Sequence, residues 1–381
     1  MKILFHCWEY PPRGSGIGRY VFHMSKALRD AGHFTVVVTS HGDEGPGESR
    51  LDNGIIYYAY PVGNIGEPRI AELVLGKAQE HRVDWIEGVE HLGESAPLLD
   101  HRSRPPVIIK AHYNDVLKCA RYAQAHYPWQ KALIDLACWR DRKRLRRERD
   151  SMEKADMLTA ATKRILWETE RQGLKLPDRR FVVPNPITPL PDWRNREAPN
   201  PTILMIGRID IGKGIEYLPM LLRALTTQFP NLQLEIVGAD SYARFVGSMK
   251  RWLIRKLGAQ TRHVKFLGTI NPADLDEAYR RAWVVIVPSR WDTFPTVVLE
   301  AMIRGKAIVA SPHGGMPEML AGTNGVVADP SGSHFAEAVV SFLADPLKRR
   351  RAGESALEKA RHHYDPKRIV SDYLAIMNSS A

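Results

Sequence analysis

The stretch "PSRWDTFPTVVLEAM", Pro288 to Met302, leads from the end of an apolar run at 283–288 into a second apolar segment. Pro295 stands just before that segment, and its fixed φ suits the first turn of a helix. The stretch therefore predicts a strand, a loop and a helix in succession, which is the unit of parallel α/β sheets. Asp292 is expected in the loop and Glu300 inside the helix.

Short apolar runs alternate with helical stretches along the rest of the chain. This alternation predicts doubly wound parallel sheets, and 381 residues suit two domains. A stretch dense in proline at 184–201 divides the runs into two series and predicts a linker. The runs are 2–7, 34–40, 84–88, 107–112, 157–161 and 180–185 in the first series, and 202–207, 234–238, 264–268, 283–288, 307–311 and 325–329 in the second.

The chain is basic, with a formal net charge of +11. This charge suits an acidic partner such as nucleotide phosphates or anionic lipid, whereas no aromatic-rich RNA motif favours nucleic acid. Segment 129–149 leads from an apolar surface at helical spacing into a cluster of arginines. Two interpretations stay open for it: a solvated charged helix, or a contact with an anionic membrane surface or acceptor.

The chain has no run of 18 apolar residues, and its start resembles a strand instead of a signal peptide. A cytoplasmic protein is expected, with the option of peripheral attachment at the inner face of the membrane. The three cysteines lack CxxC spacing, which suggests reduced thiols and no zinc site.

A glycine-rich loop at 9–20 follows the first strand. Gly14 and Gly16 would let the backbone approach a ligand, and the helix after them would present N–H groups to an anion. Arg19 occupies the position where a GxGxxG fingerprint needs glycine, which argues against a dinucleotide site. A purely structural turn remains the alternative.

A second loop, "GRIDIGKG" at 207–214, follows the first strand of the second series. Arg208 can bind phosphate oxygens in a fork, and Lys213 adds a point charge. The loop is not a Walker loop, because GxxxxGK[ST] is absent. We interpret it as a phosphate-binding loop.

The two carboxylates of the third loop and its helix, Asp292 and Glu300, could hold hydroxyls of a sugar or a ribose. Asp274 and Asp276 spell DxD, which binds metal in another fold. Here they follow a proline at an expected helix start, where the helix dipole favours acidic residues, and we interpret them as structural.

These motifs together resemble the retaining family 4 glycosyltransferases of GT-B fold. The resemblance rests on "FPTVVLEAM" with Asp292-x7-Glu300, on "GRIDIGKG" and on the glycine-rich loop, and it spans nearly the whole chain in order. Also matching are "GVEHLGESAPLL" (88–99), "AHYND" (111–115), "VVPNPI" (182–187) and "VKFLGTINPADLDEAYRRA" (264–282). The family motif has Glu where this chain has Asp292.

The resemblance implies an α/β GT-B fold, with two Rossmann-like doubly wound parallel-sheet domains facing a cleft. Residues 1–184, with a returning C-terminal helix at 365–381, would form the acceptor-side domain. Residues 185–364 would form the domain that binds the nucleotide sugar.

The resemblance also implies roles for single residues. Glu300 would hold the ribose of the donor, and Asp292 would face hydroxyls of the transferred sugar. Arg208 and Lys213 would neutralise the departing diphosphate, and His112 would lie near the reacting carbon.

Further contacts with the donor would come from backbone groups. Gly16, with Gly14 beside it, would approach the diphosphate. The backbone around Pro295, with the N–H groups of Phe294 and Thr296, would support phosphate or sugar.

The implied activity is retaining transfer of a sugar from a nucleotide-diphosphate sugar to a glycan, lipid-linked or small-molecule acceptor. No metal and no cofactor other than this donor substrate is expected. A phosphorylase or a nucleotide-sugar hydrolase on the same fold stays open, as does a basic module that binds anionic surfaces.

Overall fold

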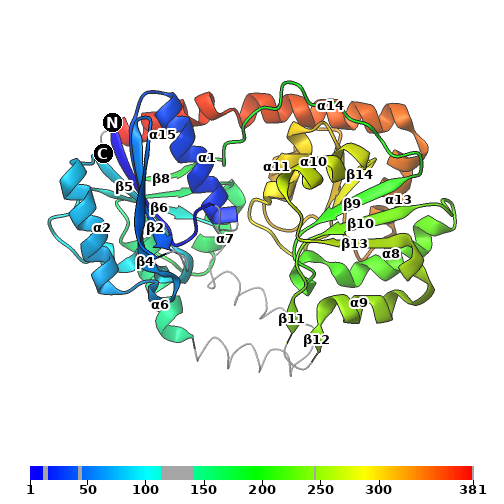
Figure 1. Ribbon diagram of the computed structural model, residues 1–381, viewed down its shortest axis with the longest axis horizontal. Coiled ribbons are helices and arrows are strands. Elements are labelled where there is room, and N and C mark those ends of the chain that lie inside the picture. The colour runs from blue at the N-terminus through cyan, green and yellow to red at the C-terminus, as the bar shows by residue number, and fades with distance from the viewer. Residues whose placement is uncertain (12–15, 42–44, 113–140, 244–245, 380–381) are drawn as a thin grey trace. The chain divides into compact units, whose positions relative to one another are not determined.

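The computed structural model describes residues 1–11, 16–41, 45–112, 141–243 and 246–379 (Figure 1). The chain divides into two compact α/β units. The first comprises Met1–Pro186 and Pro366–Ala381, and the second comprises Ile187–Asp365. Within the described residues, no helix combines the length and the apolar character needed to cross a bilayer.

The first unit is built on an eight-stranded sheet in the order β3-β4-β2-β1-β5-β6-β7-β8. Every neighbouring pair is parallel except β3 with β4. The strands are β1 (Lys2–His6), β2 (Phe34–His41), β3 (Gly47–Leu51), β4 (Gly54–Pro61), β5 (Trp85–Val89), β6 (Val107–Ala111), β7 (Met157–Ala160) and β8 (Arg180–Val182). The helices are α1 (Gly16–Asp30), η1 (Val62–Asn64), α2 (Pro68–His81), η2 (His91–Gly93), α3 (Ala96–Leu99), α6 (Arg142–Glu153), α7 (Lys163–Glu170) and α15 (Pro366–Asn378).

The antiparallel hairpin of β3 and β4 is absent from the sequence-based expectation. Strand β3 is mostly exposed and polar at the sheet edge, so it carries no apolar run. The turn that joins the strands places Asn53 at φ 55°, a conformation that asparagine tolerates better than most residues. The first sheet is therefore parallel with one antiparallel edge strand.

The C-terminal helix α15 packs beside α1 on one face of the first sheet (Figure 1). Val21 and Met24 of α1 share a buried apolar cluster with Ile369 and Tyr373 of α15. The Tyr373 hydroxyl donates to the buried carboxylate of Glu87 on β5. These contacts make α15 part of the first unit.

The second unit is built on a six-stranded parallel sheet in the order β13-β10-β9-β14-β15-β16. Its strands are β9 (Thr202–Ile206), β10 (Gln233–Val237), β13 (Val264–Gly268), β14 (Val284–Val287), β15 (Ala307–Ala310) and β16 (Val326–Val327), with a separate pair β11 (Tyr242–Ala243) and β12 (Gly247–Ser248). Its helices are η3 (Ile211–Lys213), η4 (Ile215–Tyr217), α8 (Leu218–Thr226), α9 (Met249–Leu257), η5 (Gly258–His263), α10 (Pro272–Arg281), α11 (Thr296–Ile303), α12 (Met316–Leu320), α13 (Ser333–Ala344) and α14 (Pro346–His363).

Helices cover both faces of this second sheet. Helices α8, α9 and α13 bury their apolar side chains on one face, in a cluster that includes Leu222, Leu253 and Phe342. Helices α10, α11 and α14 contact β9, β14 and β15. Strand β9 lies between β10 and β14. After β9 the sheet is first extended on one side by β10 and β13, and then on the other side by β14, β15 and β16. Ligands of open α/β sheets bind at the carboxyl end of such a switch point.

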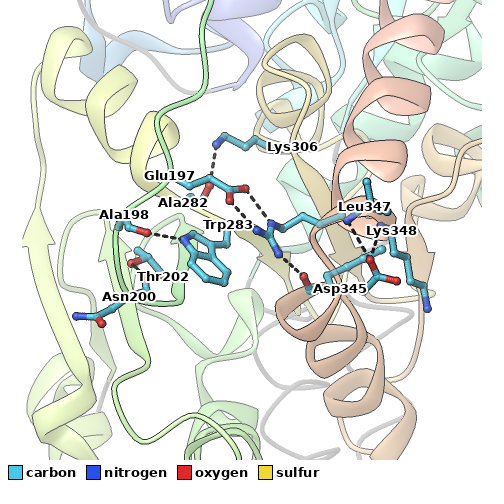
Figure 2. Close-up of polar contacts among 12 residues, drawn as sticks. Glu197, Ala198, Asn200, Thr202, Ala282, Trp283, Lys306, Asp345, Leu347 and Lys348 are labelled. Atoms are coloured by element: carbon cyan, nitrogen blue, oxygen red, sulfur yellow. Dashed lines mark hydrogen bonds and ion pairs between the residues drawn. The ribbon is translucent and has the colours of Figure 1, made fainter.

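The proline-rich stretch at 184–201 is held to the second unit in its later part. The Glu197 carboxylate pairs with the Arg349 guanidinium, with an Oε2–Nη2 distance of 2.6 Å and an Oε1–Nε distance of 2.8 Å. Figure 2 shows the indole of Trp283 directed at the Ala198 carbonyl, to which it donates at 2.9 Å. The part of the expected linker around Glu197 and Ala198 is therefore held in place by contacts with the second unit.

Candidate functional site

Three loops meet at the carboxyl ends of β9, β14 and β15. The backbone N–H of Arg290, after β14, donates to the carbonyl of Gly212, after β9, at 3.0 Å. The N–H of Gly315, after β15, donates to the carbonyl of Asp292 at 2.9 Å. These two bonds fix the positions of the loops relative to one another at the switch point of the second sheet.

Two glycines allow this close approach. Gly314 has φ +80°, and a Cβ on it would lie 1.9 Å from the Asp292 carbonyl oxygen. Gly214 has φ +79°, and a Cβ on it would lie 2.0 Å from the Pro288 carbonyl oxygen. Both the backbone conformation and the space therefore require glycine.

The loops bring Lys213 and Asp292 into an ion pair. The Lys213 Nζ lies 2.6 Å from Asp292 Oδ2, and the side chains are 29% and 18% exposed. The Asp292 charge, above all other causes, raises the pKa of Lys213 above its ordinary value. The Asp210 carboxylate accepts from the Lys213 backbone N–H at 3.0 Å and caps η3. An ammonium group is thus fixed at the switch point, with a carboxylate as its partner.

Arg208 lies in the same loop as Lys213 but is largely exposed. Its Nε is 3.4 Å from Asp210 Oδ2, and its side chain is 74% exposed. Its charge lowers the pKa of Lys213, in opposition to the effect of Asp292. The two cations predicted from the sequence are therefore close enough for their charges to interact.

Glu300 lies on α11, as the sequence predicts, and its side chain is half-buried. Its Oε2 accepts from the Tyr279 hydroxyl at 3.0 Å. Its backbone carbonyl accepts from Arg304 Nη1 at 3.0 Å. The carboxylate thus projects from a rigid helix and is held by a neighbouring one.

The residues at the start of α11 have mixed environments. Phe294 is buried, and its ring lies edge-on to that of Tyr364 with a centroid distance of 5.7 Å. Pro295 is the N-cap residue and Thr296 is the first residue of the helix. Free N–H groups of a helix start attract anions. The Phe294 side chain itself packs in the core of the second unit.

In the first unit, His112 follows β6 and is buried. Its backbone N–H donates to Glu90 Oε1 at 2.7 Å, and its ring lies edge-on to Tyr20 at 5.2 Å. Burial, reinforced by the charges of Lys110 and His91, lowers the pKa of His112 well below its ordinary value. Its Nε2 is buried without a hydrogen-bond partner. The imidazole is therefore neutral near pH 7.

Several buried charged groups of the first unit, among them Glu90 and Lys110 near His112, were not identified from the sequence. Burial raises the pKa of Glu90 to about 8, and the charge of Glu148 adds to this. Burial likewise raises the pKa of Glu94 to about 8, while lowering that of Lys110 to about 8. Glu94 accepts from the Tyr60 hydroxyl at 2.8 Å. The sequence did contain a signal for these buried charges, because charged residues stand inside or shortly after strands that are otherwise apolar.

The glycine-rich loop is described only in part, since Gly14 lies outside the described residues. Gly16 begins α1. Gly18 has a structural function, because a Cβ on it would lie 2.9 Å from the Glu9 carbonyl oxygen.

The DxD sequence serves α10. The Asn271 side chain accepts from the Asp274 N–H at 2.9 Å and caps the helix. Asp276 Oδ1 lies 2.5 Å from Arg304 Nη2. Among the described residues, no group of three or more His, Cys, Asp and Glu side chains is placed to hold a metal ion.

The basic segment 129–149 is described from residue 141 onward. Arg142, Lys143 and Arg146 are exposed on α6. On its inner side, Arg147 donates to the Gly66 carbonyl at 3.0 Å, and the buried Glu148 accepts from the Leu92 N–H at 2.9 Å. The described helix is thus docked on the first unit on one side and basic on the other.

Two family models match the chain one after the other. The one described as "Glycosyltransferase Family 4" matches residues 14–189, and the one described as "Glycosyl transferases group 1" matches residues 191–359. A glycogen synthase of Mycobacterium tuberculosis (strain H37Rv) is 29% identical over an alignment of 400 positions, gaps included, that covers 96% of this chain and 91% of the relative. A D-inositol 3-phosphate glycosyltransferase of Corynebacterium glutamicum (strain R) is 33% identical over 163 residues, which cover 42% of this chain and 39% of that protein.

Solved structures share the fold over the whole chain. The sucrose-phosphate synthase of Thermosynechococcus elongatus has a TM-score of 0.79 at 23% identity, covering 99% of this chain and 98% of that one. Anabaena HepE in complex with UDP-glucose has a TM-score of 0.69 at 19% identity, covering 98% of this chain and 99% of that one.

Proposed function

The chain belongs to the family 4 glycosyltransferases of GT-B fold, and we propose that its second unit binds the nucleotide-diphosphate sugar through Lys213, Asp292 and Glu300. It is a glycosyltransferase that acts on a nucleotide sugar. The ion pair of Lys213 with Asp292 at the switch point of the second sheet carries this assignment.

In the proposed mechanism, the diphosphate gains negative charge as its bond to the sugar breaks. Lys213, with Arg208 in the same loop, stabilises that charge more in the transition state than in the ground state. The N–H groups at the start of α11 add to the positive potential. We propose that these groups stabilise the leaving group, that transfer needs no divalent metal and that it proceeds with retention.

The two carboxylates have separate roles in this proposal. Glu300 accepts hydrogen bonds from the ribose hydroxyls, and its rigid position on α11 supports this role. Asp292, on the loop, accepts from hydroxyls of the transferred sugar. Asp292 carries one methylene less than the Glu of the family motif, so its backbone must bring the carboxylate closer. The bond of its carbonyl to Gly315 fixes that backbone.

The first unit is proposed to carry the acceptor-side groups. His112 is neutral, so its ring can accept or donate a hydrogen bond at a sugar hydroxyl without bringing a positive charge to the sugar. Gly16 is proposed to contact an anion at the start of α1. The acceptor is a glycan, a lipid-linked glycan or a small molecule.

The exposed basic side of α6 is proposed to contact an anionic membrane surface that presents the acceptor. Its support is the asymmetry of the helix, with Arg142, Lys143 and Arg146 exposed and Glu148 buried. Clusters of Lys and Arg on a helix bind anionic lipid surfaces in this way.

The test is product analysis with nucleotide sugars labelled in the sugar, in the presence of EDTA. Transfer of label to a glycan, lipid-linked or small-molecule acceptor with retained anomeric configuration is expected. Release of labelled sugar 1-phosphate in phosphate buffer would instead identify a phosphorylase, and release of free sugar as the only product would identify a hydrolase. Loss of all activity on chelation would refute metal independence.

A further inference from the structure

A tyrosine of α10 reaches across to the helix that carries Glu300. Tyr279 is fully buried, and its hydroxyl lies 3.0 Å from Glu300 Oε2 and 3.5 Å from the Val297 carbonyl oxygen. A phenol donates one proton, and the carboxylate is the nearer and stronger acceptor. The hydroxyl is thus directed at the carboxylate from inside the second unit.

Arg304, the C-cap residue of α11, also links the two helices. Its guanidinium lies 4.5 Å from the centre of the Tyr279 ring and forms the ion pair with Asp276 on α10. It also donates to the Glu300 backbone carbonyl. The ring of Tyr279, and with it the direction of its hydroxyl, is therefore held in place by a contact with α11.

This arrangement limits how the Glu300 side chain can move. A glutamate has three rotatable bonds, and a carboxylate offers two oxygens that together accept about four hydrogen bonds. A hydrogen bond from this buried hydroxyl to Oε2 restricts the rotation of the carboxylate, whose two oxygens can accept from more than one partner. A ligand that needs two hydroxyls bound side by side would then find the acceptors already oriented.

We propose that Tyr279 is a positioning residue that orients the Glu300 carboxylate for the vicinal hydroxyls of the donor ribose. The inference rests on the proposed function, in which Glu300 binds that ribose. Tyr279 acts through Glu300 and does not itself touch the donor.

The experiment compares two ligands on the full chain by isothermal titration. The ligands are a ribonucleoside diphosphate and its 2′,3′-dideoxy counterpart, with the base chosen from uridine, guanosine and adenosine by whichever binds the wild type. Tyr279→Phe keeps the ring contact with Arg304 and removes only the hydroxyl. We expect about tenfold weaker binding of the ribonucleotide and less than about twofold change for the dideoxynucleotide, because only the ribose contact loses its orientation.

Three further variants separate the possible results. Tyr242→Phe removes a phenol hydroxyl from an exposed position of the same unit and should change neither affinity. Asp276→Asn weakens the hold on Arg304 while leaving Tyr279 intact, and should cause a smaller loss in the same direction if Tyr279→Phe fails to fold. Glu300→Gln tests the ribose contact itself and should abolish most of the difference between the two ligands.

Equal weakening of both ligands by Tyr279→Phe would show a merely structural role and overturn the inference. Unchanged discrimination in Tyr279→Phe, with discrimination lost in Glu300→Gln, would overturn the inference while leaving the proposed function intact. Unchanged discrimination in Glu300→Gln would refute the ribose role of Glu300 and the inference together.

Discussion

The ammonium of Lys213 and the carboxylate of Asp292 are partners at 2.6 Å, although the residues are 79 positions apart in the chain. In the proposed function one binds the diphosphate and the other binds the transferred sugar. Without donor, each neutralises the other in a partly buried place. Donor binding must therefore redirect at least part of the Lys213 charge from the carboxylate to phosphate.

Asp292→Asn should separate these two roles. The substitution removes the competitor for Lys213, so affinity for the nucleoside diphosphate should be kept or increase. Turnover should fall about tenfold to a hundredfold, since the charged acceptor of the sugar hydroxyls is lost. Titration with the nucleoside diphosphate and steady-state kinetics measure the two effects. The double variant with Lys213→Met should show a coupling between the positions, and affinity that fell in parallel with turnover in Asp292→Asn would contradict this account.

The close approach of the loops after β14 and β15 should depend on Gly314. Gly314→Ala combines an unfavourable φ with a backbone clash against Asp292, whereas Gly322→Ala meets the same kind of φ with no atom within 4 Å. We expect about 1 kcal/mol of destabilisation for Gly322→Ala and clearly more for Gly314→Ala, together with weaker nucleotide binding. Chemical denaturation measures both. Equal losses would mean that the approach of Gly314 to Asp292 is not required.

The buried Glu94 should make stability depend on pH. Its pKa is about 8 when folded against an ordinary value of 4.5, so the folded state keeps a proton that the unfolded chain releases. Its contribution to the free energy of unfolding is therefore fully present below about pH 4.5 and is lost as the pH rises through about 8. His6, whose pKa is lowered to about 3, has the opposite effect below pH 6.5.

Glu94→Gln should consequently show a smaller fall in unfolding temperature between pH 6.5 and 8 than the wild type. Thermal unfolding at both pH values measures the difference, and effects of other groups are common to the two proteins. Parallel curves would show that Glu94 does not hold its proton in the folded state.

The exposed side of α6 should bind anionic vesicles. Reversing Arg142, Lys143 and Arg146 to Glu should weaken binding to vesicles that contain phosphatidylglycerol, by on the order of 1 kcal/mol for each residue, with nucleotide affinity unchanged. Co-sedimentation with neutral phosphatidylcholine vesicles gives the baseline. The same reversal at Lys348, Arg350 and Arg351, which are exposed on α14, is the matched control. Equal losses of vesicle binding in the two triple variants would show that α6 is a solvated basic helix without a specific role in membrane binding.

The main elements of both sheets could be predicted from the sequence, because their strands are continuous apolar runs buried on both faces. The loop position of Asp292 and the helical position of Glu300 followed from Pro295 and from the apolar residues after it. The exposed edge strand β3 has no apolar pattern to reveal it. Strand β4 does have a largely buried apolar run, which was missed in the sequence.

The contacts of the candidate site were less accessible to sequence reasoning. Lys213 was assigned to phosphate and Asp292 to sugar, yet nothing in either loop indicates that the two side chains pair. Likewise, the pKa values of Glu90 and Glu94 depend on burial by elements far along the chain. Ion pairs and desolvation are properties of the packed structure, and local pattern gives only the residues that could take part.

The most direct test of the central claim is titration of the wild type and Glu300→Ala with UDP-, GDP- and ADP-sugars in the presence of EDTA. We expect at least one nucleotide sugar to bind the wild type without metal. We expect Glu300→Ala to bind it about tenfold to a hundredfold more weakly, since a hydrogen bond to a charged group contributes about 1.5 to 3 kcal/mol. Binding that required a divalent metal, or equal affinity in the two proteins, would contradict the account of the donor site.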